Sequence, residues 1–426
     1  MPIGSRARRQ TSGGRPPVDL AVQITDVKRI VKLLHVVPTY LPAVRYGGPI
    51  YSVHAMCRAL VARGHEVHVY TTNVDGEGVS QVPLGIPVNR DGVHVWYFPT
   101  SLGRRLYRSA AMHAALAKTV SDFSVVHAHS VFLWPTLAAS AAARRANVPF
   151  VVAPRGMLVA DLIQRKSRLP KSLWIALFER RTLAKAAAVH VTSRLEADDL
   201  AKLGFRPRRV AIIPNGIALP DPAGEMPDCC ETTRSDPRPV ATSQAPTLLT
   251  LGRINWKKGL DKVIEAMPEI PMARLIIAGN DEEGYLASLK ALVARNGLTD
   301  RVSFPGPVYG AEKWKLSAAA DVFVMASRSE NFGIAALEAM ASGVPVIVAP
   351  GVGLAETVAQ GEAGLVVEAL PSAIASAARR LLDDPALRER MGRAGRRMAQ
   401  QKFSWSAIAE ATEKLYIDLA GSQHRP

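Results

Sequence analysis

The sequence has few cysteines and no long apolar run. Its 426 residues include three cysteines, of which Cys229 and Cys230 are adjacent, so neither a disulfide framework nor a cysteine-based metal cluster is indicated. No apolar stretch approaches the roughly 18 to 20 residues that a membrane-spanning helix needs. The N-terminal segment lacks the apolar core of a signal peptide, so we expect the chain to remain in the cytoplasm.

Two common ligand-binding signatures are also missing. The chain contains no Asp-x-Asp pair of the kind that holds a divalent metal, and no Gly-x-Gly-x-x-Gly of dinucleotide dehydrogenases. We therefore expect neither a bound metal nor a cofactor.

Positive charge is concentrated in the first half of the chain. Residues 1–225 hold 30 Lys and Arg against 14 Asp and Glu, whereas residues 226–426 hold 23 of each class. A basic half indicates attraction to something anionic, such as a lipid surface, a lipid-pyrophosphate acceptor or nucleic acid. A surface that serves only solubility is the alternative.

The length and the 48% hydrophobic content predict two domains with separate cores. Residues 1–29 are rich in Gly, Pro and Arg, and we expect a disordered extension there. A first domain over 30–219 and a second over 246–402 are separated by a linker at 220–245, rich in Pro, Asp, Thr and Ser. Residues 403–426 include an amphipathic helix.

Short apolar runs alternate with amphipathic segments in both domains, a pattern that predicts parallel sheets covered by helices. The expected strands of the first domain are 31–37, 66–72, 93–98, 124–128, 150–153, 189–192 and 210–213. Those of the second domain are 247–251, 275–278, 302–304, 321–326, 344–349 and 365–367.

Glu330 and Glu338 stand between two apolar strands, on a loop and on the helix that follows it. The helix begins near Phe332, where unpaired N–H groups and the positive dipole end favour an anion. Eight helical residues span about 12 Å at about 1.5 Å each. That length suits the two ends of a nucleotide-sugar with its diphosphate at the helix start. Two solvated glutamates are the alternative.

The run from Ser329 to Ile347, followed by Gly351-Val-Gly-Leu-Ala-Glu356, closely resembles the donor-site signature of family-4 retaining glycosyltransferases, the glycosyl transferases group 1 of the GT-B superfamily. The resemblance covers most of residues 31–416. It implies an α/β fold of the GT-B type, in which two Rossmann-like doubly wound domains face each other across a cleft. It also implies a last helix that crosses back to the first domain.

The resemblance further implies a set of donor-binding residues. Glu330 would hold the sugar hydroxyls and Glu338 the ribose, while Arg253 and Lys258, on one strand-end loop, would neutralise the diphosphate without a metal. The backbone near Val308 would contact the base, which leaves uridine and guanosine donors indistinguishable. The remaining donor-binding candidates surround the helix start: Asn331, Phe332, Gly333 and Ile334.

The first domain supplies candidates at the ends of its strands, where ligands of open α/β sheets bind. His129 matches a family histidine that faces the transferred sugar, and His127 is expected to be buried support. Gly47 and Gly48, before a helix-starting Pro49, match the family's glycine loop and are expected to bind the donor. Arg155 and Gly156 end another strand and are expected on the acceptor side.

Residues 164–181 combine six basic residues with an apolar face of Leu173, Trp174, Leu177 and Phe178. This segment is either a core helix with a basic flank or a helix that faces an anionic membrane and presents a lipid-linked acceptor. The second alternative would place the enzyme peripherally on the inner face of the membrane.

We therefore expect a retaining glycosyltransferase that moves a sugar from a nucleotide-diphosphate sugar to a lipid-linked or saccharide acceptor in the synthesis of cell-surface polysaccharide or glycolipid. One alternative is a nucleotide-sugar epimerase of the same fold. Another is a non-catalytic protein of this fold that binds membrane or nucleic acid, although nucleic acid is the less favoured partner.

Overall fold

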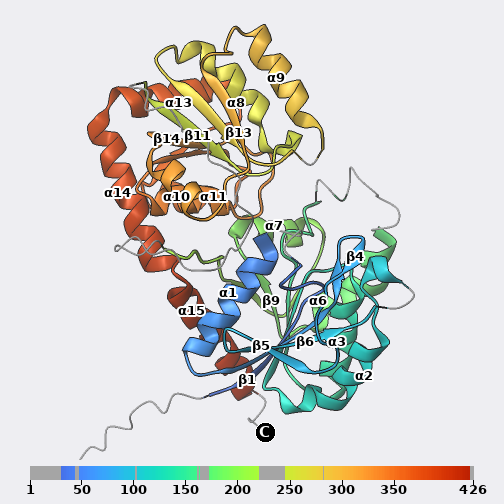
Figure 1. Ribbon diagram of the computed structural model, residues 1–426. Coiled ribbons are helices and arrows are strands. Elements are labelled where there is room, and N and C mark those ends of the chain that lie inside the picture. Colours follow the sequence, from blue (N-terminus) through green and yellow to red (C-terminus); the bar gives the residue numbers. More distant parts are fainter. Residues whose placement is uncertain are drawn as a thin grey trace, which may run out of the picture.

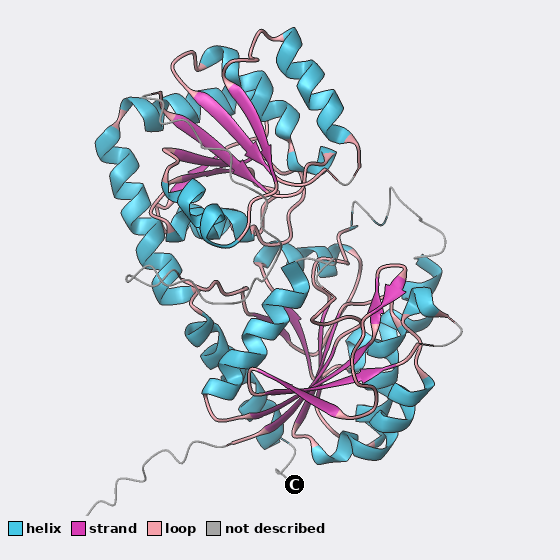
Figure 2. Ribbon diagram, in the orientation of Figure 1, coloured by secondary structure: helices cyan, strands magenta, loops and turns pink. Residues whose placement is uncertain are grey.

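The computed structural model contains two large sheets, each flanked by helices (Figures 1 and 2). The structure describes residues 30–43, 48–100, 103–160, 163, 172–219, 245–281 and 283–422. The expected N-terminal extension and nearly all of the expected linker lie outside these residues.

The first sheet has the order β10-β9-β8-β7-β1-β2-β6-β5 and is parallel except for β5. Its helices include α1 (Gly48–Ala62), α2 (Ala110–Thr119), α3 (Trp134–Arg145), α6 (Arg180–Lys185) and α7 (Arg194–Lys202). The strands are β1 (Lys32–Val36), β2 (Glu66–Thr72), β5 (Pro87–Arg90), β6 (Val93–Phe98), β7 (Val125–His129), β8 (Phe150–Ala153), β9 (Ala188–Val191) and β10 (Val210–Ile212). A separate hairpin joins β3 (Val74–Asp75) to β4 (Gly78–Val79).

The second sheet is wholly parallel, with the order β13-β12-β11-β14-β15-β16. The strands are β11 (Thr247–Leu251), β12 (Arg274–Ala278), β13 (Val302–Gly306), β14 (Val322–Met325), β15 (Val346–Val348) and β16 (Gly364–Val366). The helices are α8 (Leu260–Ala266), α9 (Tyr285–Arg295), α10 (Gly310–Ala318), α11 (Ile334–Ala341), α12 (Ala355–Gln360), α13 (Pro371–Asp383) and α14 (Pro385–Lys402).

The central strands are apolar because helices cover both faces of the sheets. Every residue of β7, β11 and β14 is buried. Two of the buried residues of β7 are histidines, His127 and His129, so polar groups occupy core positions at the end of this strand. The expected strands are confirmed, whereas the antiparallel edge strand β5 and the β3–β4 hairpin were not predicted.

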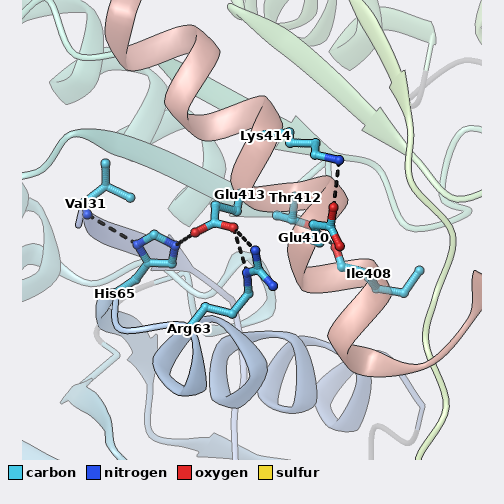
Figure 3. Close-up of polar contacts among 8 residues, drawn as sticks. All are labelled: Val31, Arg63, His65, Ile408, Glu410, Thr412, Glu413 and Lys414. Atoms are coloured by element: carbon cyan, nitrogen blue, oxygen red, sulfur yellow. Dashed lines mark hydrogen bonds and ion pairs between the residues drawn. The ribbon is translucent and has the colours of Figure 1, made fainter. Parts of the chain in front are cut away.

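The last helix, α15 (Trp405–Gly421), returns to the first sheet and packs beside α1 (Figure 1). Its Glu413 accepts hydrogen bonds from Arg63 and from His65 Nε2, the latter at 2.8 Å, as Figure 3 shows. His65 in turn accepts a bond from the Val31 N–H through Nδ1, at 3.3 Å. Buried charges are tolerated when paired in this way, so α15 is fixed to the first half of the chain.

Residues 172–179, before α6, do not form the core helix with a basic flank that was one of the two interpretations of this segment. A π-helical turn, η4 (Ile175–Glu179), precedes α6, and it buries Ile175 and Glu179 in place of the expected apolar face. Leu173, Leu177 and Phe178 are 62%, 59% and 41% exposed. The core interpretation of this face is therefore wrong for these three residues. The basic residues at 164–171 lie outside the described part of the chain.

Candidate functional site

The loop between β14 and α11 carries the first candidate acid. The backbone of Glu330 donates to Gly351 O and accepts from Gly353 N–H, both at 2.9 Å. A side chain at position 353 would overlap the Asn331 carbonyl, which explains the glycine there. The Glu330 carboxylate forms an ion pair with Lys258 Nζ. The structure thus brings these two predicted residues together.

The start of α11 lies beside this pair. Gly333 has a φ of 103° at the N-cap, and no side chain caps the helix. A Cβ at Gly333 would stand 2.8 Å from the Val352 side chain, so the turn requires glycine at this position. Phe332 is buried in the core below. The N–H groups of the first turn of α11 are therefore left for a ligand.

A crevice beside the loop after β11 holds the predicted cations. Arg253 and Lys258 line it together with Gly252, Met325 and Ser327. Gly259, directly after Lys258, lies against the Ala326 backbone, where a Cβ would overlap the carbonyl oxygen. The Ser327 Oγ is buried and has no hydrogen-bond partner among the described residues. A phosphate oxygen would supply one.

The second acid pairs with a residue that was not predicted. Glu338 on α11 accepts from Lys313 Nζ on α10 at 2.6 Å. Lys313 has no local sequence signature, because a lysine in an amphipathic helix is ordinary. Val308 precedes α10 and is partly buried against the core that includes Phe332. Its assigned contact with the base remains a prediction.

A buried cluster of four histidines lies at the other sheet. His129 Nε2 is 3.0 Å from His35 Nδ1, and His129 Nδ1 accepts from Arg155 Nε at 3.3 Å. Arginine can only donate, so His129 carries its proton on Nε2. Burial lowers the pKa of His35 and of His190 to about 3, and it holds the pKa of His127 and His129 well below the usual value. The four imidazoles are neutral at pH 7.

His127 is buried support, as expected. Its Nδ1 is 2.6 Å from Tyr416 OH on α15, and its Nε2 is 3.4 Å from His190 Nδ1. The ligating nitrogens of His35, His127 and His129 lie within 4.8 Å of one another, which is also compatible with a metal site. A divalent ion there would have only neutral ligands beside the Arg155 guanidinium. The arrangement therefore fits a hydrogen-bonded cluster better than a metal centre.

The two halves meet at the candidate site. Asn331 Nδ2 donates to Thr192 Oγ1 at 2.8 Å, and Ser193 Oγ donates to the Asn331 carbonyl at 2.9 Å. A Cβ at Gly156 would be 2.9 Å from the Asn331 side chain. The end of β8 therefore lies directly opposite the Glu330 loop, with Arg155 and His129 on one side and Lys258 on the other.

Glu196 was not predicted and supports this junction. It is buried and accepts from the N–H groups of Gly156 and Thr192, each at 2.7 Å. The Ser193-x-x-Glu196 spacing is a helix capping signature, and Ser193 does cap α7. That signature could have identified the position, although not its contact with Gly156.

The glycine loop is only partly described. Gly47 lies outside the described residues, and Gly48 begins α1 with no atom of the described residues within 4 Å of a Cβ added there. The described part of the chain therefore leaves space for a side chain at 48, and the donor-binding role of both residues remains a prediction. Among the described helices, none combines the length and apolarity needed to cross a bilayer.

Comparisons with known proteins agree with this architecture. Residues 47–216 match the family model of the glycosyl transferase 4-like domain, and residues 232–398 match that of glycosyl transferases group 1. The D-inositol 3-phosphate glycosyltransferase of Jonesia denitrificans is 30% identical over 85% of this chain and 89% of its own length.

Two solved structures share the fold. Sucrose-phosphate synthase from Thermosynechococcus elongatus superposes with a TM-score of 0.69 at 22% identity, covering 92% of this chain and 100% of the other. Anabaena HepE in complex with UDP-glucose gives 0.66 at 19% identity, covering 90% and 99%. The chain belongs to the glycosyl transferases group 1 family and has its GT-B fold of two Rossmann-like domains.

Proposed function

We propose that this glycosyltransferase moves a sugar from a nucleotide-diphosphate sugar to an acceptor hydroxyl with retention of configuration and without a metal ion. The observation that carries the proposal is the Lys258–Glu330 pair at the uncapped start of α11, opposite Arg155 and His129. A cation, a helix tip and an acid stand where diphosphate and sugar would lie.

The proposed chemistry uses groups that are already positioned. Arg253, Lys258 and the N–H groups of α11 stabilise the negative charge that grows on the leaving diphosphate. As Lys258 turns to the diphosphate, the Glu330 carboxylate is released to accept from sugar hydroxyls. Glu338 accepts from the ribose, and the leaving phosphate assists removal of the acceptor proton on the same face as its departure. UDP-glucose is the first donor to test, because HepE was solved with it.

Transfer assays with the variants Glu330→Gln and Arg253→Ala test the assignment. We expect each to lose about a hundredfold or more in kcat/KM, as is typical when a group that stabilises transition-state charge is removed. The exposed residues of the same domain changed in Glu312→Gln and Arg295→Ala serve as controls. Unimpaired transfer by both site variants would remove the assignment. EDTA is expected to leave the rate unchanged, and the product anomer reports retention.

The rival activity is epimerisation of the nucleotide-sugar. Incubation with donor alone separates the two, because an epimerase alters the sugar without releasing it. A non-catalytic binding protein would show salt-dependent nucleic-acid or vesicle binding and no affinity for nucleotide-sugars.

The acceptor side of the proposal includes a membrane. Leu173, Leu177 and Phe178 are exposed, and Arg181 and Lys185 are exposed in the following turns. Apolar side chains beside cations suit the boundary of an anionic bilayer. We therefore favour a lipid-linked acceptor in polysaccharide or glycolipid synthesis over a soluble saccharide.

A further inference from the structure

Arg155 is a partly exposed cation without a carboxylate partner among the described residues. It donates from Nη1 to Asn215 Oδ1 at 3.0 Å, and from Nε and Nη2 to His129 Nδ1 at 3.3 and 3.1 Å. Both partners are neutral. Burial lowers the pKa of the guanidinium, although the charge of Glu196 acts against this shift.

The Glu196 carboxylate, whose charge acts on Arg155, is already engaged elsewhere. Glu196 accepts from the N–H groups of Gly156 and Thr192 and from the Thr192 hydroxyl, at 2.7, 2.7 and 3.1 Å. Its two oxygens are therefore directed at these groups, and Arg155 makes no ion pair with Glu196. A partly buried charge without a direct counter-ion is unfavourable unless a ligand pairs with it.

The backbone conformation of Arg155 is a second indication of a ligand. Its φ is 55°, in the left-handed region that favours glycine. An arginine at such a position is retained against its conformational preference, and strain of this kind gathers at ligand-binding sites. Gly156, the next residue, touches the loop of Glu330 and Asn331. The guanidinium is thus at the junction where donor sugar and acceptor would meet.

We propose that Arg155 binds an oxyanion carried by the acceptor, a phosphate or a carboxylate group. Three of the five guanidinium N–H groups contact His129 and Asn215, and the two that remain are the number used in a bidentate contact with such a group. The donor diphosphate has its own cations in Arg253 and Lys258. This inference rests on the proposed function, since it assigns the class of acceptor for the same cleft.

Thermal stabilisation by simple anions tests the assignment. Inorganic phosphate and acetate are titrated at constant ionic strength into the enzyme saturated with UDP, which occupies the donor cations. We expect at least one anion to raise the Tm of the wild type further, and Arg155→Gln to weaken its apparent affinity at least tenfold. Asn215→Asp should do the same, because it gives the intact guanidinium a carboxylate partner.

Controls separate this site from the donor site. Arg209→Gln removes an exposed cation that pairs with Asp418 and should keep the anion effect. The double variant Arg253→Ala/Lys258→Ala, titrated without nucleotide, should also keep it. The last titration does not depend on UDP binding, so a failure of UDP to stabilise the wild type counts against the proposed function alone.

Three outcomes overturn the inference. They are no stabilisation of the double variant by either anion, an unchanged anion effect in Arg155→Gln, and an Arg155-dependent effect that UDP abolishes. The last would assign Arg155 to the donor diphosphate. Equal stabilisation of Arg155→Gln and wild type by UDP confirms that the variant is folded.

Discussion

Asn331, the residue after Glu330, donates a 2.8 Å hydrogen bond to Thr192 across the boundary between the two sheets. Replacing it by alanine removes a contact that joins the domains at the site. A neutral hydrogen bond contributes about 1 kcal/mol, so we expect Asn331→Ala to reduce kcat/KM for the acceptor about fivefold. Because Thr192 engages this side chain, which was predicted to bind the donor, affinity for the nucleotide, measured by calorimetry, should change less than twofold. Thr192→Val should reproduce the effect, and a purely donor-side loss in either variant would contradict it.

Glu338 is expected to bind the nucleotide rather than the sugar. Charge-assisted hydrogen bonds contribute about 1.5 to 3 kcal/mol, so Glu338→Gln should weaken UDP binding at least tenfold, as measured by calorimetry. Lys313, its partner in the structure, orients the carboxylate, and Lys313→Met should give a smaller loss. Glu389→Gln, at an exposed position on α14, is the control. Full UDP affinity in Glu338→Gln would exclude the ribose contact.

The contacts of Glu413 on α15 with Arg63 and His65 should contribute to the stability of the protein and to its dependence on pH. Burial raises the pKa of Glu413, but the hydrogen bonds from Arg63 and His65 outweigh it and leave this pKa lowered. A lowered carboxyl pKa gives stability that is present above the unfolded value of about 4.3 and is lost as the pH falls through the folded pKa. Glu413→Gln weakens hydrogen bonds to a charged group and should lower the free energy of unfolding by about 2 kcal/mol at pH 7.

Thermal denaturation of Glu413→Gln beside Glu410→Gln checks this expectation. Glu410 pairs with Lys414 one turn away and is exposed (Figure 3), so its variant should melt like the wild type. The difference between Glu413→Gln and wild type should shrink as the pH falls from about 4.3, the unfolded value, through the lower folded pKa, below which the carboxyl is protonated in both states. A stability difference between Glu413→Gln and wild type that stays constant down to pH 3 would exclude a stabilising role for the charged Glu413.

The histidine cluster should make the folded state sensitive to acid. The unfolded chain takes up protons at its histidines below about pH 6.5, whereas the folded His35 and His190 remain neutral to about pH 3. The free energy of unfolding should therefore fall by about 1.4 kcal/mol per pH unit for each such histidine between these values. Denaturant titrations at pH 7, 6 and 5 measure the slope. His190→Gln removes one of these histidines and should reduce the slope by about 1.4 kcal/mol per pH unit. His113→Gln, at an exposed position, should leave the slope unchanged.

The exposed apolar face should bind vesicles. Leu177→Ser combined with Phe178→Ser removes two exposed apolar side chains and should reduce co-sedimentation with anionic lipid vesicles at least fivefold, since each such side chain contributes about 1.5 to 3 kcal/mol when fully buried. Leu370→Ser, an exposed leucine of the other domain, should bind as the wild type does. If the double variant loses binding equally to neutral and to anionic vesicles, the result would argue against a contribution of the basic residues to membrane binding.

Parts of the fold and site follow directly from local chemistry. The strands could be predicted because apolar runs such as Val322–Met325 must be covered on both faces. Lys258 and Glu330 were assigned to one donor site by the family resemblance, and the structure joins them in an ion pair that was not itself predicted. The Glu338 partner Lys313 and the Thr192 contact could not be predicted, because they depend on how separate elements and domains approach each other.

The histidine cluster and η4 show a second limit. His35 and His190 lie within strands where neighbouring apolar residues dominate the pattern. His35 is the register partner of His127 on the adjacent strand, and His190 lies 3.4 Å from His127. An ordinary helical period placed Leu173, Leu177 and Phe178 on one face but left open whether that face packs in the core or meets a membrane. The turn at Ile175–Glu179 is π-helical, and these three side chains are exposed.

The return of α15 to the first sheet has a consequence for biosynthesis. Tyr416 and Leu415 belong to the core that also contains Leu33 and Val69, so the domain made first lacks part of its interior until more than 340 further residues beyond Val69 have been translated. Its final consolidation must await the second domain, and a fragment ending before Phe403 should expose apolar surface and aggregate.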